Sequence, residues 1–189
     1  IHPVASVFDM KRSVEKKYDL LVWGIIQPYK GILEFMQFVQ NNEEMRSMRI
    51  LVAGKCFDSH YKEKMNTYLP GNMVYLDELL TLEEIAGLAA QSRFILFPYQ
   101  TVSILSSGSL MDSVAMQTPI IGPNDGAFKD LGLFGFVHTY GSLNDLPAIY
   151  DRYANNPFSF QQQMAEFCRN NTWEKFAEKF SKELGSVAE

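Results

Sequence analysis

The sequence contains little cysteine, no long hydrophobic run and no strong excess of charge. Its 189 residues include two cysteines, Cys56 and Cys168, and their wide separation predicts reduced thiols rather than a disulfide framework. No apolar run approaches the roughly 20 residues that a membrane-spanning helix needs, and no signal peptide is visible. The formal net charge of −5 gives no general reason to expect binding to nucleic acid or to an anionic membrane.

Several sequence motifs of enzymes are also missing. The three histidines, His2, His60 and His138, lack the spacing of metal ligands, so no metal site is expected. There is no Gly-x-Ser-x-Gly elbow and no Walker loop, and no Gly-x-Gly-x-x-Gly fingerprint is present. The last absence argues against a dinucleotide-dependent dehydrogenase.

What is present is the composition of an ordinary globular protein, with 47% hydrophobic and 21% charged residues. The length suits a single domain with a substantial core, which we expect to span residues 1–189. The chain begins at Ile1 rather than at Met. We therefore expect either a piece of a longer protein or a processed N-terminus.

Short hydrophobic runs alternate with amphipathic stretches along most of the chain. The Thr81-x-x-Glu84 pattern is a capping box that predicts the start of one helix. Strands are expected at residues 20–24, 49–54, 73–76, 94–97, 119–121 and, less clearly, 135–138, and other helices at about 30–40, 59–68, 108–117, 142–153 and 157–169. This alternation predicts an α/β fold with a parallel sheet and helices on both faces.

A final helix is expected near the C-terminus, with its hydrophobic residues on one stripe. The stripe comprises Trp173, Phe176, Ala177, Phe180 and Leu184. The simplest interpretation is that these side chains belong to the core or to a docking surface, and a role in ligand binding is the less favoured alternative.

The sequence Ser106-Ser107-Gly108-Ser109 stands between a buried strand and a helix. Ligands of open α/β sheets bind beyond the carboxyl ends of the strands, and a helix that begins there directs unpaired N–H groups toward an anion. Gly108 would let a phosphate approach the backbone, and Ser107 and Ser109 would add hydroxyl donors. Simple capping by serine remains the alternative interpretation.

A second turn, the sequence WGIIQPYKG from Gly24 to Gly31, follows the first strand. It places Lys30 at the expected start of a helix, where a positive charge is unfavourable unless an anion lies between them. Lys30 is therefore either a phosphate ligand or an exposed surface lysine, and in both cases we expect it to contribute little to stability.

These segments, taken in order, resemble the C-terminal, donor-binding half of a GT-B glycosyltransferase of the glycosyltransferase-1 / family 4-like group. The resemblance rests on five stretches in the order that the family has them. They are LLVWGIIQPYKGILEFM, RILVAGK, LTLEEIAGLAAQSRFILFPY, SSGSLMDSVAMQTPIIGPNDGA and NNTWEKFAEKF. It covers nearly the whole chain and implies a Rossmann-like sheet, with a helix at residues 170–189 that packs back toward an N-terminal domain absent from this chain.

The resemblance also implies a ligand and its binding residues. The ligand is a nucleotide-diphosphate sugar of the UDP or GDP type, with no further cofactor, and its diphosphate is held by Lys30 and the helix start at Ser107, Gly108 and Ser109. The ribose-binding carboxylate falls on Asp112. Donor-loop roles are implied for Gly24, Tyr99 and Ser106.

Two departures from the family affect the donor site. Many relatives have arginine where this chain has Ile25, and the first acid of the Glu-x7-Glu pair would fall on Ile104. Either the sugar is held differently, through the loop at residues 99–106, or the donor site is altered. A non-catalytic sensor or scaffold domain and a nucleotide-sugar epimerase of the same architecture are therefore the alternatives to a transferase.

For the whole protein, the resemblance implies a hexosyltransferase of bacterial polysaccharide or glycolipid synthesis. The acceptor, a saccharide or a lipid-linked sugar, would bind mainly to the missing N-terminal domain, so this domain alone should transfer little sugar. A cytoplasmic protein is implied, with peripheral contact of the full-length protein with the inner face of the membrane.

Overall fold

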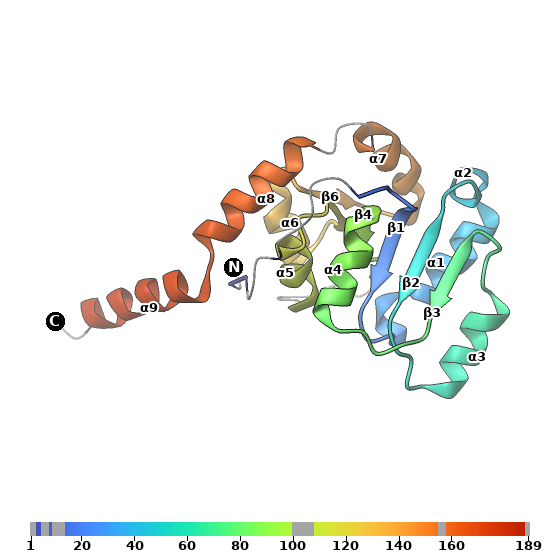
Figure 1. Ribbon diagram of the computed structural model, residues 1–189, viewed down its shortest axis with the longest axis horizontal. Helices are drawn as coiled ribbons and strands as arrows, with labels where there is room; N and C mark the ends of the chain where they lie inside the picture. The colour runs from blue at the N-terminus through green and yellow to red at the C-terminus, as the bar shows by residue number, and fades with distance from the viewer. Residues whose placement is uncertain (1–2, 5–7, 9–13, 100–107, 155–157, 188–189) are drawn as a thin grey trace.

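The computed structural model describes residues 3–4, 8, 14–99, 108–154 and 158–187 of the chain. Its strands form one parallel sheet in the order β3-β2-β1-β4-β5-β6 (Figure 1). The strands are β1 (Tyr18–Trp23), β2 (Ile50–Ala53), β3 (Met73–Leu76), β4 (Ser92–Leu96), β5 (Ile120–Pro123) and β6 (Val137–Tyr140). The helices are η1 (Pro28–Lys30), α1 (Ile32–Asn41), α2 (Glu43–Arg46), α3 (Ser59–Thr67), α4 (Leu82–Ala90), α5 (Gly108–Ala115), α6 (Gly126–Gly132), η2 (Leu143–Asp145), α7 (Leu146–Tyr153), α8 (Phe158–Asn170) and α9 (Trp173–Val187).

Both faces of the sheet are covered, because successive side chains of each buried strand point to opposite faces. In β1, Leu20 and Val22 pack into a core with helices α1, α2, α3 and α7. Leu21 and Trp23 pack into the other core, with α4, α5, α6 and α8. The predicted α/β, Rossmann-like sheet with helices on both faces is therefore confirmed.

The expected strands are all present, and the one at residues 135–138 begins two residues later than predicted, at Val137. Gly135 has a left-handed φ of 80° and belongs to the turn before the strand. The capping box at α4 is also confirmed, since Thr81 and Glu84 exchange both hydrogen bonds.

The predicted helix start at Lys30 is wrong. Lys30 is the last residue of the short 3₁₀ turn η1, and α1 begins two residues later, at Ile32. Pro28 opens this turn, and Gly31 closes it with a left-handed φ of 67°. Pro28 and Gly31 therefore make Lys30 part of a tight turn rather than the start of a helix.

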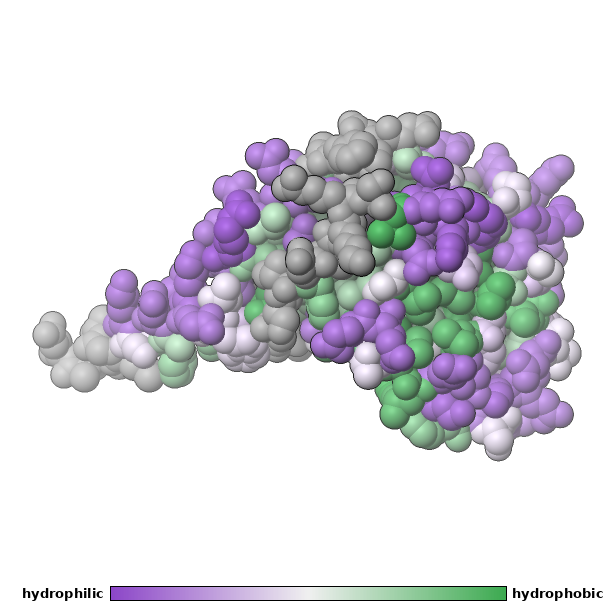
Figure 2. Space-filling model, in the orientation of Figure 1, coloured by the Kyte–Doolittle hydropathy of each residue, from purple (hydrophilic) through white to green (hydrophobic). Residues whose placement is uncertain are grey.

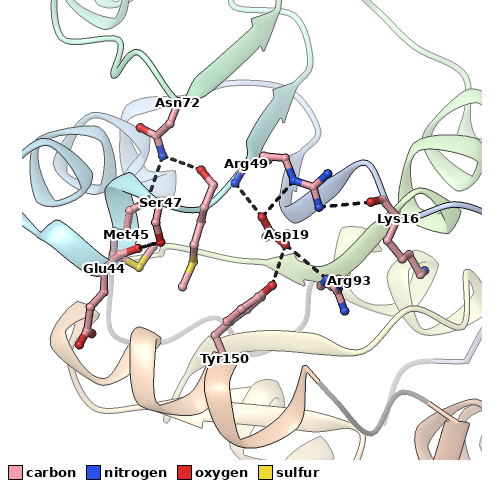
Figure 3. Close-up of polar contacts among 10 residues, drawn as sticks. Lys16, Asp19, Glu44, Met45, Ser47, Arg49, Asn72, Arg93 and Tyr150 are labelled. Carbon is pink, nitrogen blue, oxygen red and sulfur yellow. Dashed lines mark hydrogen bonds and ion pairs between the residues drawn. The ribbon is translucent and has the colours of Figure 1, made fainter.

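At the amino end of the sheet, a buried carboxylate ties β1 to its neighbours (Figure 3). Asp19 accepts hydrogen bonds from the Arg49 backbone N–H at 2.8 Å and from the Tyr150 hydroxyl at 2.6 Å, and it pairs with Arg93 at 3.4 Å. Burial acts to raise the pKa of Asp19, but the hydrogen bonds from Arg49 and Tyr150 outweigh it and lower the pKa below its usual value. This network joins β1 to β4, to α7 and to the residue that precedes β2.

Helix α9 extends away from the body of the protein (Figure 1). Its aromatic side chains are exposed, at 46% for Trp173, 45% for Phe176 and 55% for Phe180. The interpretation of these residues as core is therefore wrong, and docking against another part of the protein stays a prediction. Within the residues that the structure describes, no helix has the length and hydropathy required to cross a bilayer.

Candidate functional site

Two glycine turns meet at the carboxyl end of the sheet. Gly24 follows β1 with a φ of 104°, and Gly54 follows β2. A Cβ on Gly54 would overlap the carbonyl oxygen of Gly24, so any other residue at position 54 would force the two turns apart. The turns therefore lie in direct contact, and this contact brings the exits of two neighbouring strands together.

Lys30 folds back over the first of these turns. Its Nζ lies only 2.8 Å from the point where a Cβ on Gly24 would stand, and the Oγ of Ser109 lies 3.7 Å from the same point. The absence of a side chain at Gly24 thus allows a lysine and the first turn of α5 to converge. Residues far apart in the sequence, Gly24 and Lys30 on one side and Ser109 on the other, therefore form one site.

The Lys30 side chain is buried, with only 4% of its surface exposed. Burial lowers the pKa of Lys30 to about 8, because a cation loses its hydration there. In the described part of the chain no carboxylate forms an ion pair with Lys30. The interpretation of Lys30 as an exposed surface lysine is therefore wrong, and a desolvated ammonium of this kind suits an anionic ligand.

Tyr99, in the segment that follows β4, places its aromatic ring near the Lys30 ammonium. The Nζ of Lys30 lies 5.9 Å from the centroid of the Tyr99 ring. The Tyr29 ring, next to Lys30 in the sequence, packs edge-on against Tyr99 at 6.0 Å. Tyr99 is itself 6% exposed, so its ring is buried in the protein.

A buried hydrogen-bond relay fixes the first turn of α5 to the end of β1. The Trp23 Nε1–H donates to the Oγ of Ser113 at 2.9 Å, and the Ser113 hydroxyl donates to the carbonyl of Ser109 at 2.7 Å. Gly108, the first residue of α5, is exposed, and a Cβ there would meet no described atom within 4 Å. Within the described residues, no atom therefore crowds the start of α5 at Gly108.

A cavity of about 170 Å³ opens between these turns and the loop after β3. Trp23, Gly24, Gly54 and Ser109 line it, together with Lys55, Glu78 and a hydrophobic group. The hydrophobic group consists of Ile25, Leu79, Leu80 and Ile85. Exposed hydrophobic side chains at this end of the sheet include Ile25, Phe57 and Leu79 in the loops and Leu82 at the start of α4. Figure 2 shows hydrophobic surface at this lower end of the body.

The other residues named in the sequence analysis differ in where they lie relative to this cavity. Asp112 is half-buried on α5, one turn after Gly108, and does not line the cavity. Ser106, Ser107 and Ile104 lie outside the described residues. Ile25, in place of the arginine of many relatives, is 38% exposed at the cavity wall.

Some residues of the site were not predicted. Gly54 carried a usable signal, since a glycine directly after a buried strand often allows close approach of another backbone. Ser113 carried none, because Trp23, which donates a hydrogen bond to it, is 90 residues away in the sequence.

No protein-family model and no curated protein sequence matches this chain. Solved structures do match its fold. The glycosyltransferase AviGT4 of avilamycin A biosynthesis matches with a TM-score of 0.67 at 18% identity, over 92% of this chain and 52% of that one. HepE of Anabaena, in complex with UDP, matches with a TM-score of 0.68 at 12% identity, over 90% and 49%. Sucrose-phosphate synthase of Thermosynechococcus elongatus matches with a TM-score of 0.64 at 14% identity, over 92% and 46%.

The chain therefore spans about half the length of the structures that it matches. These structures are GT-B glycosyltransferases, and the chain has the fold of one of their two halves. The resemblance seen in the sequence is confirmed at the level of the fold.

Proposed function

We propose that this chain is the donor-binding half of a GT-B glycosyltransferase and that it binds a nucleoside diphosphate sugar. The observation that carries the proposal is the buried Lys30 ammonium, which has no carboxylate partner among the described residues and converges with the start of α5 on Gly24. A diphosphate would supply the negative charge that this arrangement lacks.

The reaction that such a site favours is the departure of a nucleoside diphosphate from a sugar. Negative charge develops on the leaving diphosphate in the transition state, and fixed positive groups at that point lower the barrier. Lys30 and the first N–H groups of α5 are such groups, with the Ser109 hydroxyl as a further donor. The relay from Trp23 through Ser113 holds the helix start in place, so no reorganisation is needed when the charge develops.

The solved structures support the nucleotide. HepE is described in complexes with UDP, with UDP and glucose, and with UDP-glucose. We therefore assign a UDP or GDP sugar as the donor, Gly108, Ser109 and Ser107 as its diphosphate-binding helix start, and Asp112 as the ribose ligand. Transfer of a hexosyl group is the corresponding reaction.

Binding of the acceptor would take place on the other half of the GT-B fold. We assign the acceptor, a saccharide or lipid-linked sugar, to a domain that this chain does not span, and we assign the exposed stripe of α9 to contact with that domain. The chain alone should accordingly bind donor and transfer little sugar. A role in polysaccharide or glycolipid synthesis, a cytoplasmic location and a peripheral membrane contact stay predictions.

Thermal unfolding with nucleotides tests the proposal. UDP or GDP should stabilise the chain by RT ln(1 + [L]/Kd), which is about 2.7 kcal/mol at a hundredfold excess over Kd. Uridine and guanosine, which lack the diphosphate, should shift the melting temperature much less. If neither UDP nor GDP at millimolar concentration shifts it, the proposal fails.

A non-catalytic domain that has lost the site is the second candidate, because Ile25 places an exposed hydrophobic side chain at the cavity wall. The same titration decides between the two, since a scaffold would not select diphosphates over nucleosides.

A further inference from the structure

Tyr140, the last residue of β6, makes an unusual connection across the sheet. Its hydroxyl reaches past β5 to the exit of β4, where it donates to the carbonyl oxygen of Phe97 at 3.0 Å and lies 3.4 Å from that of Tyr99. Tyr140 is only 6% exposed, so this hydrogen bond is made away from water. The contact fixes the backbone that carries the Tyr99 side chain.

The Tyr99 ring is held from three sides. Phe97 contacts it edge-on at 5.4 Å, Phe128 at 6.0 Å and Tyr29 at 6.0 Å. Edge-to-face contacts of this kind fix the orientation of a ring as well as its place. The Nζ of Lys30 lies 5.9 Å from the centroid of the ring, within the range of a cation–π interaction.

We propose that the Tyr99 ring keeps the buried Lys30 ammonium charged, and that Tyr140 is the positioning residue that holds Tyr99 against it. The inference about charge stands on the geometry alone, whereas its consequence for ligand binding rests on the proposed function.

The groups around Lys30 explain why its charge would depend on the Tyr99 ring. Among the described residues, the titratable Tyr99 side chain contacts Lys30 and is itself packed against Tyr29, and no carboxylate pairs with Lys30. In the adjoining cavity, Lys55 is 3.3 Å from the carboxylate of Asp77 and Glu78 is exposed. A buried cation without an ion pair depends on the remaining attractive groups, and among the described residues these include the Tyr99 ring and the nearby Ser109 hydroxyl.

A ligand-free titration tests this directly. Lysine labelled with ¹³C at Cε reports the protonation of each ammonium by NMR, and Lys30→Arg identifies the Lys30 signal. Relative to the parent, Tyr99→Leu should lower the midpoint of Lys30 by roughly one pH unit, because the ring face is lost. Tyr99→Phe keeps that face and should keep the midpoint. Tyr140→Phe keeps its volume but loses the hydrogen bond, so the midpoint should fall by a smaller amount.

Tyr150→Phe is the matched control, because it removes a partly buried tyrosine hydroxyl at the opposite end of the sheet, where it donates to Asp19. It should lower the melting temperature without moving the Lys30 midpoint. If Tyr99→Leu and Tyr140→Phe also lower only the melting temperature, their role is structural and the inference is overturned. Should Tyr99→Leu not fold, the Tyr140→Phe titration decides alone.

Binding of UDP gives the functional readout. A midpoint lowered from about 8 to about 7 reduces the charged fraction of Lys30 at pH 7.5 roughly threefold, and the UDP affinity of Tyr99→Leu should fall by the same factor. The difference from the parent should close below pH 6, where Lys30 is charged in both. A parent chain that does not bind UDP or GDP would contradict the proposed function, and the NMR midpoints would still decide the role of Tyr99.

Discussion

Replacing Lys30 by methionine should separate its effect on binding from its effect on stability. Methionine keeps most of the length and the hydrophobic stem of lysine but carries no charge. The shift of the Lys30 pKa from 10.5 to about 8 corresponds to about 3 kcal/mol that the folded chain loses by burying the charged form. Lys30→Met should therefore raise the free energy of unfolding at pH 7 by up to about 3 kcal/mol, and each kcal/mol raises Tm by about 2–4 °C for a domain of this size.

The dependence on pH follows from the same difference in pKa. Between about pH 8 and pH 10.5 the unfolded chain holds the Lys30 proton more tightly than the folded chain does, so the stability of the parent rises with pH over that range. The Met variant lacks this group, and its advantage should be largest below pH 8 and vanish near pH 10.5.

Thermal unfolding from pH 6 to pH 10.5 and calorimetric titration with UDP provide the assay. The UDP affinity of Lys30→Met should fall at least about tenfold, since a charge-assisted contact to phosphate is lost. Lys64→Met, the same change at an exposed position of α3, is the matched control and should alter neither quantity. A variant that is less stable than the parent at every pH, or that binds UDP as tightly, would refute the reasoning.

Three further changes test other parts of the account. Gly108→Ala should leave the melting temperature unchanged or higher while weakening UDP binding about tenfold. The added methyl group would occupy the place where a phosphate is expected, and no described atom lies within 4 Å of it. If calorimetry shows unchanged affinity, the serines act as helix caps only. Asp112→Asn should weaken binding of UDP much more than binding of pyrophosphate, since an amide replaces one acceptor with a donor, and parallel losses would rule out a ribose contact. Asp19→Asn should destabilise the chain by about 1–3 kcal/mol at pH 7. The lowered pKa of Asp19 means that this stability is present above the unfolded-state pKa near 3.9 and is lost as pH falls further, so acid titrations of parent and variant should converge; a constant gap would contradict it.

The fold could be predicted from the sequence because its strands are hydrophobic on both faces. Leu20, Leu21 and Val22 are all buried, and such a continuous run is typical of a parallel strand between two layers of helices. The boundary of β6 was harder, because the glycine before it belongs to a turn and the strand extends to Tyr140, whose hydroxyl donates to the distant carbonyl of Phe97.

The candidate site was predictable only in part. The turn at Gly24 and the helix start at Gly108 carry local signals, and the fold brings both to one edge. The burial of Lys30 was not predictable from its residue type, because lysine is almost always exposed. The burial of Lys30 results from the 3₁₀ turn that Pro28 and Gly31 form and from the space left by the missing Gly24 side chain. Both depend on how the chain folds.

The most direct test of the central claim is a titration of the ¹⁵N-labelled chain with UDP, followed by NMR. The account predicts saturable shifts of the backbone amides that surround the site, those of Gly24, Gly54, Gly108 and Ser109, and their loss in Lys30→Met. The aromatic stripe of α9 should not respond. Saturable shifts confined to other parts of the chain, or no saturation at millimolar UDP and GDP, would contradict the claim that this edge of the sheet binds a nucleoside diphosphate.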